Sequence, residues 1–190
     1  MQLRRADVLR GARDLIDAEG LDALTMRKLG AALNVQAGAL FWLFSGKQAL
    51  LVAIAEEMLA GVADSPPAGP WDQRLVTLAH RVRRALLGLR DGARLVAETF
   101  ATEPNTRLTG RTGRTILMDA GLPAEQAAWA MSALGNYILG QAIEQQAAGP
   151  DWALAQAGDD ELAAAVVAGP DRRFEFGLGL MIDGIRRLVG

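Results

Sequence analysis

The 190-residue sequence predicts an all-helical protein of two domains. Apolar residues recur at helical spacing along most of the chain, whereas no segment alternates apolar and polar residues as a half-buried strand does. No unit of about 20 to 50 residues is repeated, so a repeat architecture is not indicated. The prolines in residues 64–70 cannot continue a helix, and they predict a linker between an N-terminal and a C-terminal group of helices.

The first predicted helix spans residues 3–19 and ends at Gly20, a common C-terminal stop. Its apolar stripe consists of Leu3, Val8, Leu9, Ala12, Leu15 and Ile16. The basic residues on its other faces could reach phosphate groups or could simply be solvated. The helix is therefore expected to pack across the elements that follow it.

Two short helices are predicted at 26–33 and 36–44, and only Asn34 and Val35 separate them. So short a connection indicates a helix-turn-helix. Thr25 is expected to cap the first helix, and Asn34 to adopt the left-handed backbone that a sharp turn requires. The residues expected to be buried are Leu29, Ala32, Leu33 and Leu40. The first turn of the second helix then points outward and fits the major groove of DNA.

The remaining helices follow from the same periodicity. A fourth helix begins at Gly46-Lys47 and runs to about residue 63, with Leu50, Leu51, Ile54, Met58 and Leu59 facing inward. Further helices are predicted at 71–87, 92–101, 105–119, 123–147 and 172–188. Residues 149–170 are rich in Gly, Ala and Asp and are expected to form a loop with one short helix. The arginines expected on solvated faces of the helix at 71–87 are Arg81, Arg83 and Arg84.

The composition narrows the possible classes of function. The chain has no cysteine and a single histidine, His80, which excludes disulfides, thiolate catalysis and cysteine-ligated metals. The net charge is -2, but residues 1–50 hold seven basic against five acidic groups, a small positive excess where DNA would bind. No signal peptide and no membrane-spanning run is recognisable, so a cytoplasmic protein without a membrane partner is expected.

The helix-turn-helix region resembles the tetracycline-repressor (TetR) family of bacterial one-component regulators. The matching positions are Leu24, Thr25, Arg27, Lys28, Leu29, Leu33, Val35, Gly38, Leu40, Phe41, Phe44, Lys47, Ala49 and Leu50. Members of that family usually carry a Thr and a Tyr that touch phosphates, where this chain has Ala39 and Phe41. Two hydroxyl contacts to DNA are therefore missing.

The resemblance and the geometry of a helix-turn-helix together predict the DNA contacts. Arg27 and Gln36 are the best candidates for reading base edges, and Lys47 near a helix N-terminus suits a phosphate. The second helix is also expected to make apolar contacts to thymine methyl groups. The expected DNA-binding residues are Thr25, Arg27, Gln36, Ala37, Gly38, Ala39, Phe41, Trp42 and Lys47.

Three segments of the C-terminal half, 71–95, 132–146 and 174–185, resemble the ligand-binding and dimerisation domain of the tetracycline repressors. The resemblance implies that helices 123–147 and 171–188 pair with their twins in a four-helix dimer interface. The expected interface residues are Ala127, Ala130, Leu134, Phe174, Leu178, Met181 and Ile182. An exposed apolar stripe on the last helix would otherwise favour aggregation, which agrees with a covered face.

The tetracycline repressors hold their drug as a magnesium chelate, through histidines and polar groups such as an Asn. The corresponding positions here are Ala63, Leu78, Val82 and Val96. Thr99 and Glu144 remain, but without a histidine ligand neither a metal nor a cofactor is expected. The expected pocket suits an apolar or amphipathic small molecule, although each apolar residue could equally be core. Its residues are Leu59, Leu78, Val82, Val96, Phe100 and Met131, with Thr99, Ser132, Asn136 and Glu144 as polar groups.

The sequence thus predicts a homodimeric, ligand-responsive transcriptional repressor that binds a palindromic operator. Residues 1–46 would form the DNA-binding domain, 47–63 a connecting helix, and 71–190 the effector-binding and dimerisation domain. The alternatives are a helical small-molecule or partner-binding module with degenerate DNA binding, and a transcriptional activator. An enzyme is not indicated, since the only candidate groups are isolated carboxylates: Asp91, Glu98 and Glu144.

Overall fold

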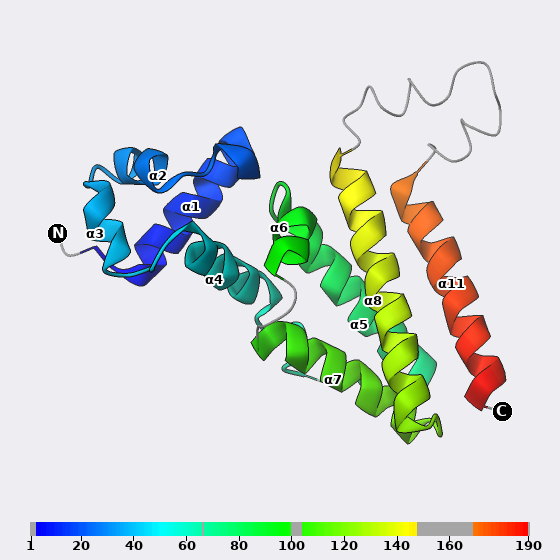
Figure 1. Cartoon of the computed structure of the whole chain (residues 1–190). Helices are drawn as coiled ribbons and strands as arrows, with labels where there is room; N and C mark the ends of the chain where they lie inside the picture. The colour runs from blue at the N-terminus through cyan, green and yellow to red at the C-terminus, as the bar shows by residue number, and fades with distance from the viewer. Residues whose placement is uncertain (1–2, 66, 100–103, 148–168, 190) are drawn as a thin grey trace, which may run out of the picture.

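All regular structure is helical in the computed structural model, which describes residues 3–65, 67–99, 104–147 and 169–189. The chain forms two groups of helices placed end to end, as Figure 1 shows. Helices α1 to α4 lie at one end, and α5 to α8 with α11 form a bundle at the other. No helix in these described ranges has the length and apolar character needed to cross a bilayer.

The N-terminal group has a small core of its own. It comprises α1 (Arg5–Glu19), the 3-10 turn η1 (Leu21–Ala23), α2 (Met26–Ala32), α3 (Ala37–Phe41) and the start of α4 (Lys47–Leu59). The core side chains from these elements are Val8, Ala12, Ile16, Leu21, Leu29, Leu40 and Leu50, each no more than 1% exposed. Because α1 packs on η1, α2 and α4, it holds the two short helices in a fixed orientation.

The local features predicted around the turn are confirmed. The Thr25 hydroxyl accepts a hydrogen bond from the Lys28 amide at 3.1 Å, as an N-cap should. Asn34 has a φ of 54°, in the left-handed region. The prediction that Ala32 is buried is wrong, because α2 contains only seven residues and its buried face is limited to Leu29 and Gly30.

The C-terminal bundle consists of α5 (Trp71–Leu87), α6 (Gly92–Thr99), α7 (Pro104–Asp119), α8 (Ala124–Ala147) and α11 (Pro170–Val189). Helix α8 is its central element, since it packs on α5, α6, α7 and α11. In Figure 1, α8 and α11 run side by side. Helix α4 contacts α1 in one domain and α5, α6 and α7 in the other, so it connects the two cores.

The bounds of these helices agree with the sequence prediction to within a few residues. The predicted loop at 149–170 falls almost wholly on residues 148–168, which lie outside the described residues, as do the last two residues of the predicted helix 92–101. The expectation that Arg83 is solvated is wrong. Its side chain is only 12% exposed, because its guanidinium lies 4.6 Å from the centre of the Phe174 ring and bonds Gln145 and Asp171.

The left-handed Asn34 yields a stability prediction. Asn34→Ala should lower the free energy of unfolding by about 1 kcal/mol, because a Cβ without a local hydrogen-bonding side chain is disfavoured there. Asn34→Gly should be neutral or stabilising, since glycine adopts this backbone freely. Urea unfolding followed by circular dichroism measures both values, and equal losses in the two variants would contradict the argument.

Candidate functional site

The outward face of the helix-turn-helix is mostly apolar. Phe41 is 51% and Trp42 is 91% exposed, while Gly38 and Ala39 add no polar group to the surface. Among the other residues predicted to bind DNA, Gln36, Thr25 and Arg27 are exposed. Ala37 and Lys47 are half-buried. The structure therefore places all nine predicted residues on or at the edge of one domain, with few hydrogen-bonding groups on α3 itself.

Glycine at position 30 sets how closely α2 and α3 approach. A Cβ at this position would lie 2.9 Å from the Val35 carbonyl oxygen and 3.2 Å from the Ala37 amide nitrogen. Both neighbours are backbone atoms, so they could not move aside without opening the turn. Gly30 is not among the residues predicted from the sequence, although a glycine inside a short helix is a signal of such close contact.

Arg5 contacts the segment that follows α3. Its Nη1 donates a hydrogen bond to the Leu43 carbonyl at 3.0 Å, and its guanidinium lies 4.1 Å from the centre of the Phe44 ring. A cation that bonds a carbonyl just past the end of a helix supplies a partner that the helix itself cannot. Arg5 is thus occupied with the protein and is poorly placed to neutralise a phosphate.

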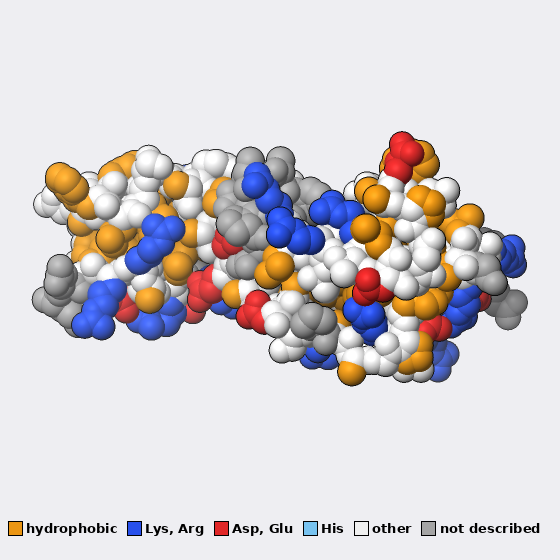
Figure 2. Space-filling model, turned by 90° about the horizontal axis from the view of Figure 1, so that it is seen from below, with side chains coloured by type: hydrophobic (Ala, Val, Ile, Leu, Met, Phe, Trp, Pro, Cys, Tyr) orange, Lys and Arg blue, Asp and Glu red, His pale blue; other side chains and the backbone are white. Residues whose placement is uncertain are grey.

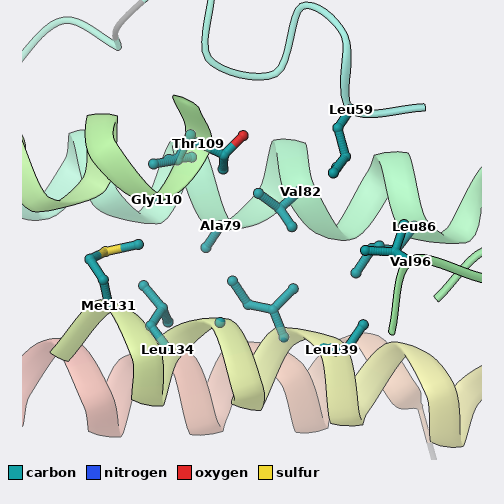
Figure 3. A pocket seen from close by; sticks show the side chains of 13 residues that line it. Leu59, Ala79, Val82, Leu86, Val96, Thr109, Gly110, Met131, Leu134 and Leu139 are labelled. Atoms are coloured by element: carbon teal, nitrogen blue, oxygen red, sulfur yellow. The ribbon is translucent and has the colours of Figure 1, made fainter. Parts of the chain in front are cut away.

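An apolar cavity of about 110 Å³ lies inside the C-terminal bundle. Its walls come from the end of α4 and from α5, α6, α7 and α8, and Figure 3 shows their side chains converging on one space. The lining residues are Leu59, Leu78, Ala79, Val82, Leu86, Val96, Thr109, Gly110, Met131, Leu134, Gly135, Ile138 and Leu139. Five of the predicted effector residues are among them: Leu59, Leu78, Val82, Val96 and Met131.

The polar groups predicted for this pocket do not line the cavity. Thr99 is buried, but its hydroxyl donates to the carbonyls of its own helix, at Leu95 and Val96. Ser132 and Asn136 are exposed on α8. The Glu144 carboxylate is also at the surface, 2.9 Å from the Arg173 guanidinium. The predicted Phe100 lies outside the described residues.

Four residues of α8 that line the cavity were not predicted there, and they explain why Ser132 and Asn136 were wrongly expected to line it. Leu134, Gly135, Ile138 and Leu139 form a continuous stripe of α8 toward the cavity, and Ser132 and Asn136 lie on another face of this helix. The hydroxyl of Thr109, from α7, is the polar side-chain group in Figure 3. The cavity is therefore more apolar than the sequence suggested.

The residues predicted for the dimer interface are largely committed to the core of their own chain. Phe174, Leu178 and Ile182 are each at most 3% exposed, since α11 packs this stripe on α8 and α5. Ala127 is buried and Leu134 lines the cavity. Only the half-buried Ala130 and Met181 reach the surface, in a shallow hollow between α8 and α11. The apolar stripe of α11 that was predicted to be exposed therefore faces its own bundle.

A second apolar stripe, which the sequence analysis missed, occupies the outer face of the same helix pair. Phe176 is 71%, Leu180 59% and Leu188 62% exposed on α11, and Trp129 is 62% exposed on α8. Phe176 and Leu180 each follow an inward residue of α11 by two positions, so they point away from the bundle. Trp129 and Leu188 lie at the shallow hollow between α8 and α11. The signal was present as an apolar residue at every second position of the segment from Phe174 to Leu180.

The two domains are joined by hydrogen bonds between the end of α1 and the turn that connects α5 to α6. The Arg90 amide donates to the Asp17 carboxylate at 2.8 Å, and the Leu21 amide donates to the Asp91 carboxylate at 2.8 Å. The Arg90 guanidinium also donates to carbonyls in the last turn of α1, at 3.1 Å for Ala18. These bonds link backbone groups of one domain to side chains of the other.

An ion pair strengthens this joint. Arg94 donates two hydrogen bonds to the Asp22 carboxylate and a third to Glu98 at 3.1 Å. The hydrogen bonds from Arg94 hold the pKa of Asp22 below its ordinary value. Because the pKa is depressed in the folded state, the stabilisation is present at neutral pH and is lost as the pH falls through that lowered value.

No cluster of three or more metal-ligating side chains occurs in the part of the chain that the structure describes. His80 contacts Phe174 edge-on, with ring centres 5.7 Å apart, and its Nε2 lies 3.4 Å from the Glu175 carboxylate. It is absent from the cavity lining. The residues at the cavity thus offer a metal ion no set of ligands.

The class of protein follows from these features and from comparison with known proteins. Residues 8–54 match the family described as bacterial regulatory proteins, tetR family, and residues 64–189 match the tetracyclin repressor-like C-terminal domain. The chain belongs to the TetR family of bacterial transcriptional regulators.

Similar proteins support this assignment along the full length. The tetracycline repressor protein class A of Escherichia coli is 38% identical over 99% of this chain and 94% of its own. The crystal structure of a possible TetR family transcriptional regulator from Streptomyces coelicolor A3(2) shares 40% identity, with a TM-score of 0.88 over 97% of this chain and all of that one. A TetR variant from Acinetobacter baumannii AYE, in complex with minocycline, shares 38% identity with a TM-score of 0.80 over 99% of each chain.

The Arg5 contacts yield a second stability prediction. Arg5→Ala should lower the free energy of unfolding by about 1 kcal/mol, through loss of an exposed charged hydrogen bond and a cation–π contact. Arg10→Ala is the matched control, because Arg10 bonds only Asp7 on its own helix and should change stability by less than about 0.5 kcal/mol. Urea denaturation compares the two, and equal effects would show that Arg5 does not secure the end of α3.

Proposed function

We propose that the protein is a homodimeric transcriptional repressor that binds a palindromic operator and is released by a small apolar or amphipathic effector. The observation that carries the proposal is an apolar cavity in a helical bundle that is hydrogen-bonded to a helix-turn-helix domain. A ligand that fits only one arrangement of the bundle can therefore bias the orientation of the DNA-binding domain.

The DNA contacts follow from the exposed face of the N-terminal domain. We propose that Arg27 and Gln36 read base edges and that Phe41 and Trp42 contact thymine methyl groups or sugars, a proposal supported by the exposure of all four residues. Thr25 and Lys47 lie beside helix N-termini, where a phosphate is favoured. We assign residues 1–46 to DNA binding, 47–63 to the connection and 71–190 to effector binding and dimerisation.

We propose that the outer face of α8 and α11 is the dimer interface. Trp129, Phe176, Leu180 and Leu188 would leave a contiguous apolar surface in water on an isolated chain. A two-fold axis through this face would bury the same side chains of both copies and set two helix-turn-helix units against successive half-sites. Of the residues predicted from sequence, Met181 and Ala130 would contribute from the hollow between the helices.

The cavity limits the class of effector. Its volume of about 110 Å³ is well below the roughly 300 to 1,000 Å³ typical of pockets for drug-sized molecules. The effector is therefore a compact apolar molecule, or a larger one that moves α7 and α8 apart. Met131 lies against Gly113 of α7, so a rotamer change of its flexible side chain is the simplest way to enlarge the space.

A cytoplasmic location and the absence of enzymatic activity belong to the same proposal. Operator DNA is reached in the cytoplasm of a bacterium. The isolated carboxylates in the sequence are all engaged in structural contacts: Asp91 with the Leu21 amide, Glu98 with Arg94, and Glu144 with Arg173. None of the three lines the cavity.

Binding to DNA tests the proposed function directly. The dimer should bind a fragment from the promoter region flanking its own gene more tightly than a random duplex, and more weakly at higher salt, because bound phosphates release counterions. Arg27→Ala should reduce specific binding by about 1 to 3 kcal/mol if it reads a base. Arg84→Ala, an exposed arginine of α5, should leave binding unchanged.

Fluorescence anisotropy at two salt concentrations measures these affinities. An equal loss for Arg27→Ala on every duplex would make Arg27 a phosphate contact. Equal binding to all duplexes, or none, would favour a ligand-binding module whose DNA binding has degenerated, in keeping with Ala39 and Phe41. Higher transcription from a reporter in the presence of the protein would instead identify an activator.

Tetracycline provides a test of the effector class. Titration with tetracycline should give no magnesium-dependent binding, since Leu78, Val82 and Val96 line the cavity and offer no metal ligands. Isothermal titration calorimetry with and without Mg²⁺ measures this, with a class A tetracycline repressor as the positive control. Binding that requires Mg²⁺ would contradict the proposed apolar effector but would leave the DNA-binding proposal intact.

A further inference from the structure

Gln146, in the last turn of α8, reaches across to the turn between α5 and α6. Its Oε1 accepts a hydrogen bond from the Ala93 amide at 3.0 Å. Its Nε2 donates to the carbonyls of Leu89 at 2.7 Å and Leu86 at 3.2 Å. One side-chain amide therefore satisfies three backbone groups from both sides of the turn.

The Leu86 carbonyl and the Ala93 amide lie at helix ends and need a partner from outside their helices, whereas the Leu89 carbonyl also accepts from the Gly92 amide at 2.9 Å. The last carbonyls of α5 and the first amides of α6 have no bonding partner within their own helices. The turn is also tightly packed at Gly92. A Cβ at Gly92 would lie 2.5 Å from the Leu86 carbonyl oxygen and 2.7 Å from the Met58 methyl group. Gln146 thus holds the turn in place from the direction of the bundle.

The opposite side of the same turn bonds the DNA-binding domain. Arg90 and Asp91 bond Asp17 and Leu21, respectively, at 2.8 Å. The turn therefore has two sets of hydrogen bonds, one to α8 and one to the end of α1 and η1. Because the turn between α5 and α6 is only a few residues long, a shift of one set displaces the other.

The cavity adjoins this arrangement. Leu86 and Val96, on the two sides of the turn, line the cavity together with Ile138 and Leu139 of α8. Any molecule that enlarges the cavity by moving α8 away from α5 must also move Gln146 relative to the turn. Such a movement would strain the hydrogen bonds between Gln146 and the α5–α6 turn.

We infer that Gln146 is a positioning residue that couples the cavity wall to the DNA-binding domain through the α5–α6 turn. The inference deepens the proposed function, because it names the side chain by which a change in the cavity reaches α1. A glutamine is required, since only a neutral amide on a side chain of this length supplies an acceptor and two donors at one end. A methionine has the same length and fills the same space without these bonds.

The experiment measures hydrogen exchange of single amides by NMR in the full-length dimer, without DNA or effector. Gln146→Met should speed exchange of the Ala93 amide, its direct partner, by about five- to tenfold. It should also speed exchange of the Leu21 and Arg90 amides by at least about threefold, although neither touches Gln146. A side chain that only stabilised α8 would not act selectively at these distant amides.

Gln141→Met is the matched control. Gln141 lies on α8, is half-buried as Gln146 is, and also accepts a bond across to another helix, from Arg173 Nε at 3.1 Å. This variant should leave the Ala93, Leu21 and Arg90 amides at their wild-type rates. Similar acceleration in both variants would overturn the inference, because it would reflect general loosening of the bundle.

Faster exchange at Ala93 alone in Gln146→Met would also overturn the inference, since Gln146 would then be a local cap. If Gln146→Met does not fold, Asp17→Ala tests the same coupling from the other domain, because coupling between two sites is reciprocal. It removes the acceptor of the Arg90 amide and should speed exchange at Ala93, and an unchanged rate would overturn the inference. A protein that binds its operator but fails these tests would lose only this inference.

Discussion

The hydrogen bonds around the α5–α6 turn are the interaction on which the arrangement of the two domains depends. Asp91 occupies the left-handed region with a φ of 56°, which costs about 1 kcal/mol for a residue with a side chain. Its carboxylate offsets that cost by accepting the Leu21 amide. The Arg90 guanidinium lies at the carbonyl end of α1, where the helix dipole favours a cation. The relative orientation of the domains is therefore fixed by directional bonds as well as by the packing of α4 on α6.

The sequence was sufficient to place the described helices because their determinants are local. Periodic leucines, the prolines around residues 66–70 and the glycines at helix ends act within a few residues, and the predicted helix at 71–87 matches α5 at both ends. Thr25 and Asn34 are also local signals, one through a cap and the other through its backbone. The helix-turn-helix was predictable for the same reason.

The site was less predictable because it depends on how each helix is rotated about its axis. Helix α11 has two apolar stripes, and nothing in its sequence says that Phe174 faces its own bundle while Phe176 faces outward. On α8 the same uncertainty placed Ser132 and Asn136 in a pocket that Leu134 and Ile138 line. Gln146 could not be predicted at all, since its partners are backbone groups that carry no signature in the sequence.

Most basic residues of the N-terminal domain bond other groups of the protein. Arg5 bonds the Leu43 carbonyl just past α3. Arg10, Arg13 and Lys28 each pair with a carboxylate of the protein, which leaves few cations for phosphates. On the face shown in Figure 2, basic side chains lie at the N-terminal end, in the middle and at the C-terminal end of the molecule.

With few free cations, the proposed operator binding would depend on the apolar surface of α3 fitting both half-sites at once. A fit of this kind is sensitive to the angle between the two helix-turn-helix units. In the proposed mechanism the hydrogen bonds at Asp17, Leu21 and Asp22 set that angle, so a displacement of the α5–α6 turn would lower operator affinity. With few phosphate contacts to hold the protein on DNA, the hydrogen bonds between the two domains would have a larger effect on operator affinity.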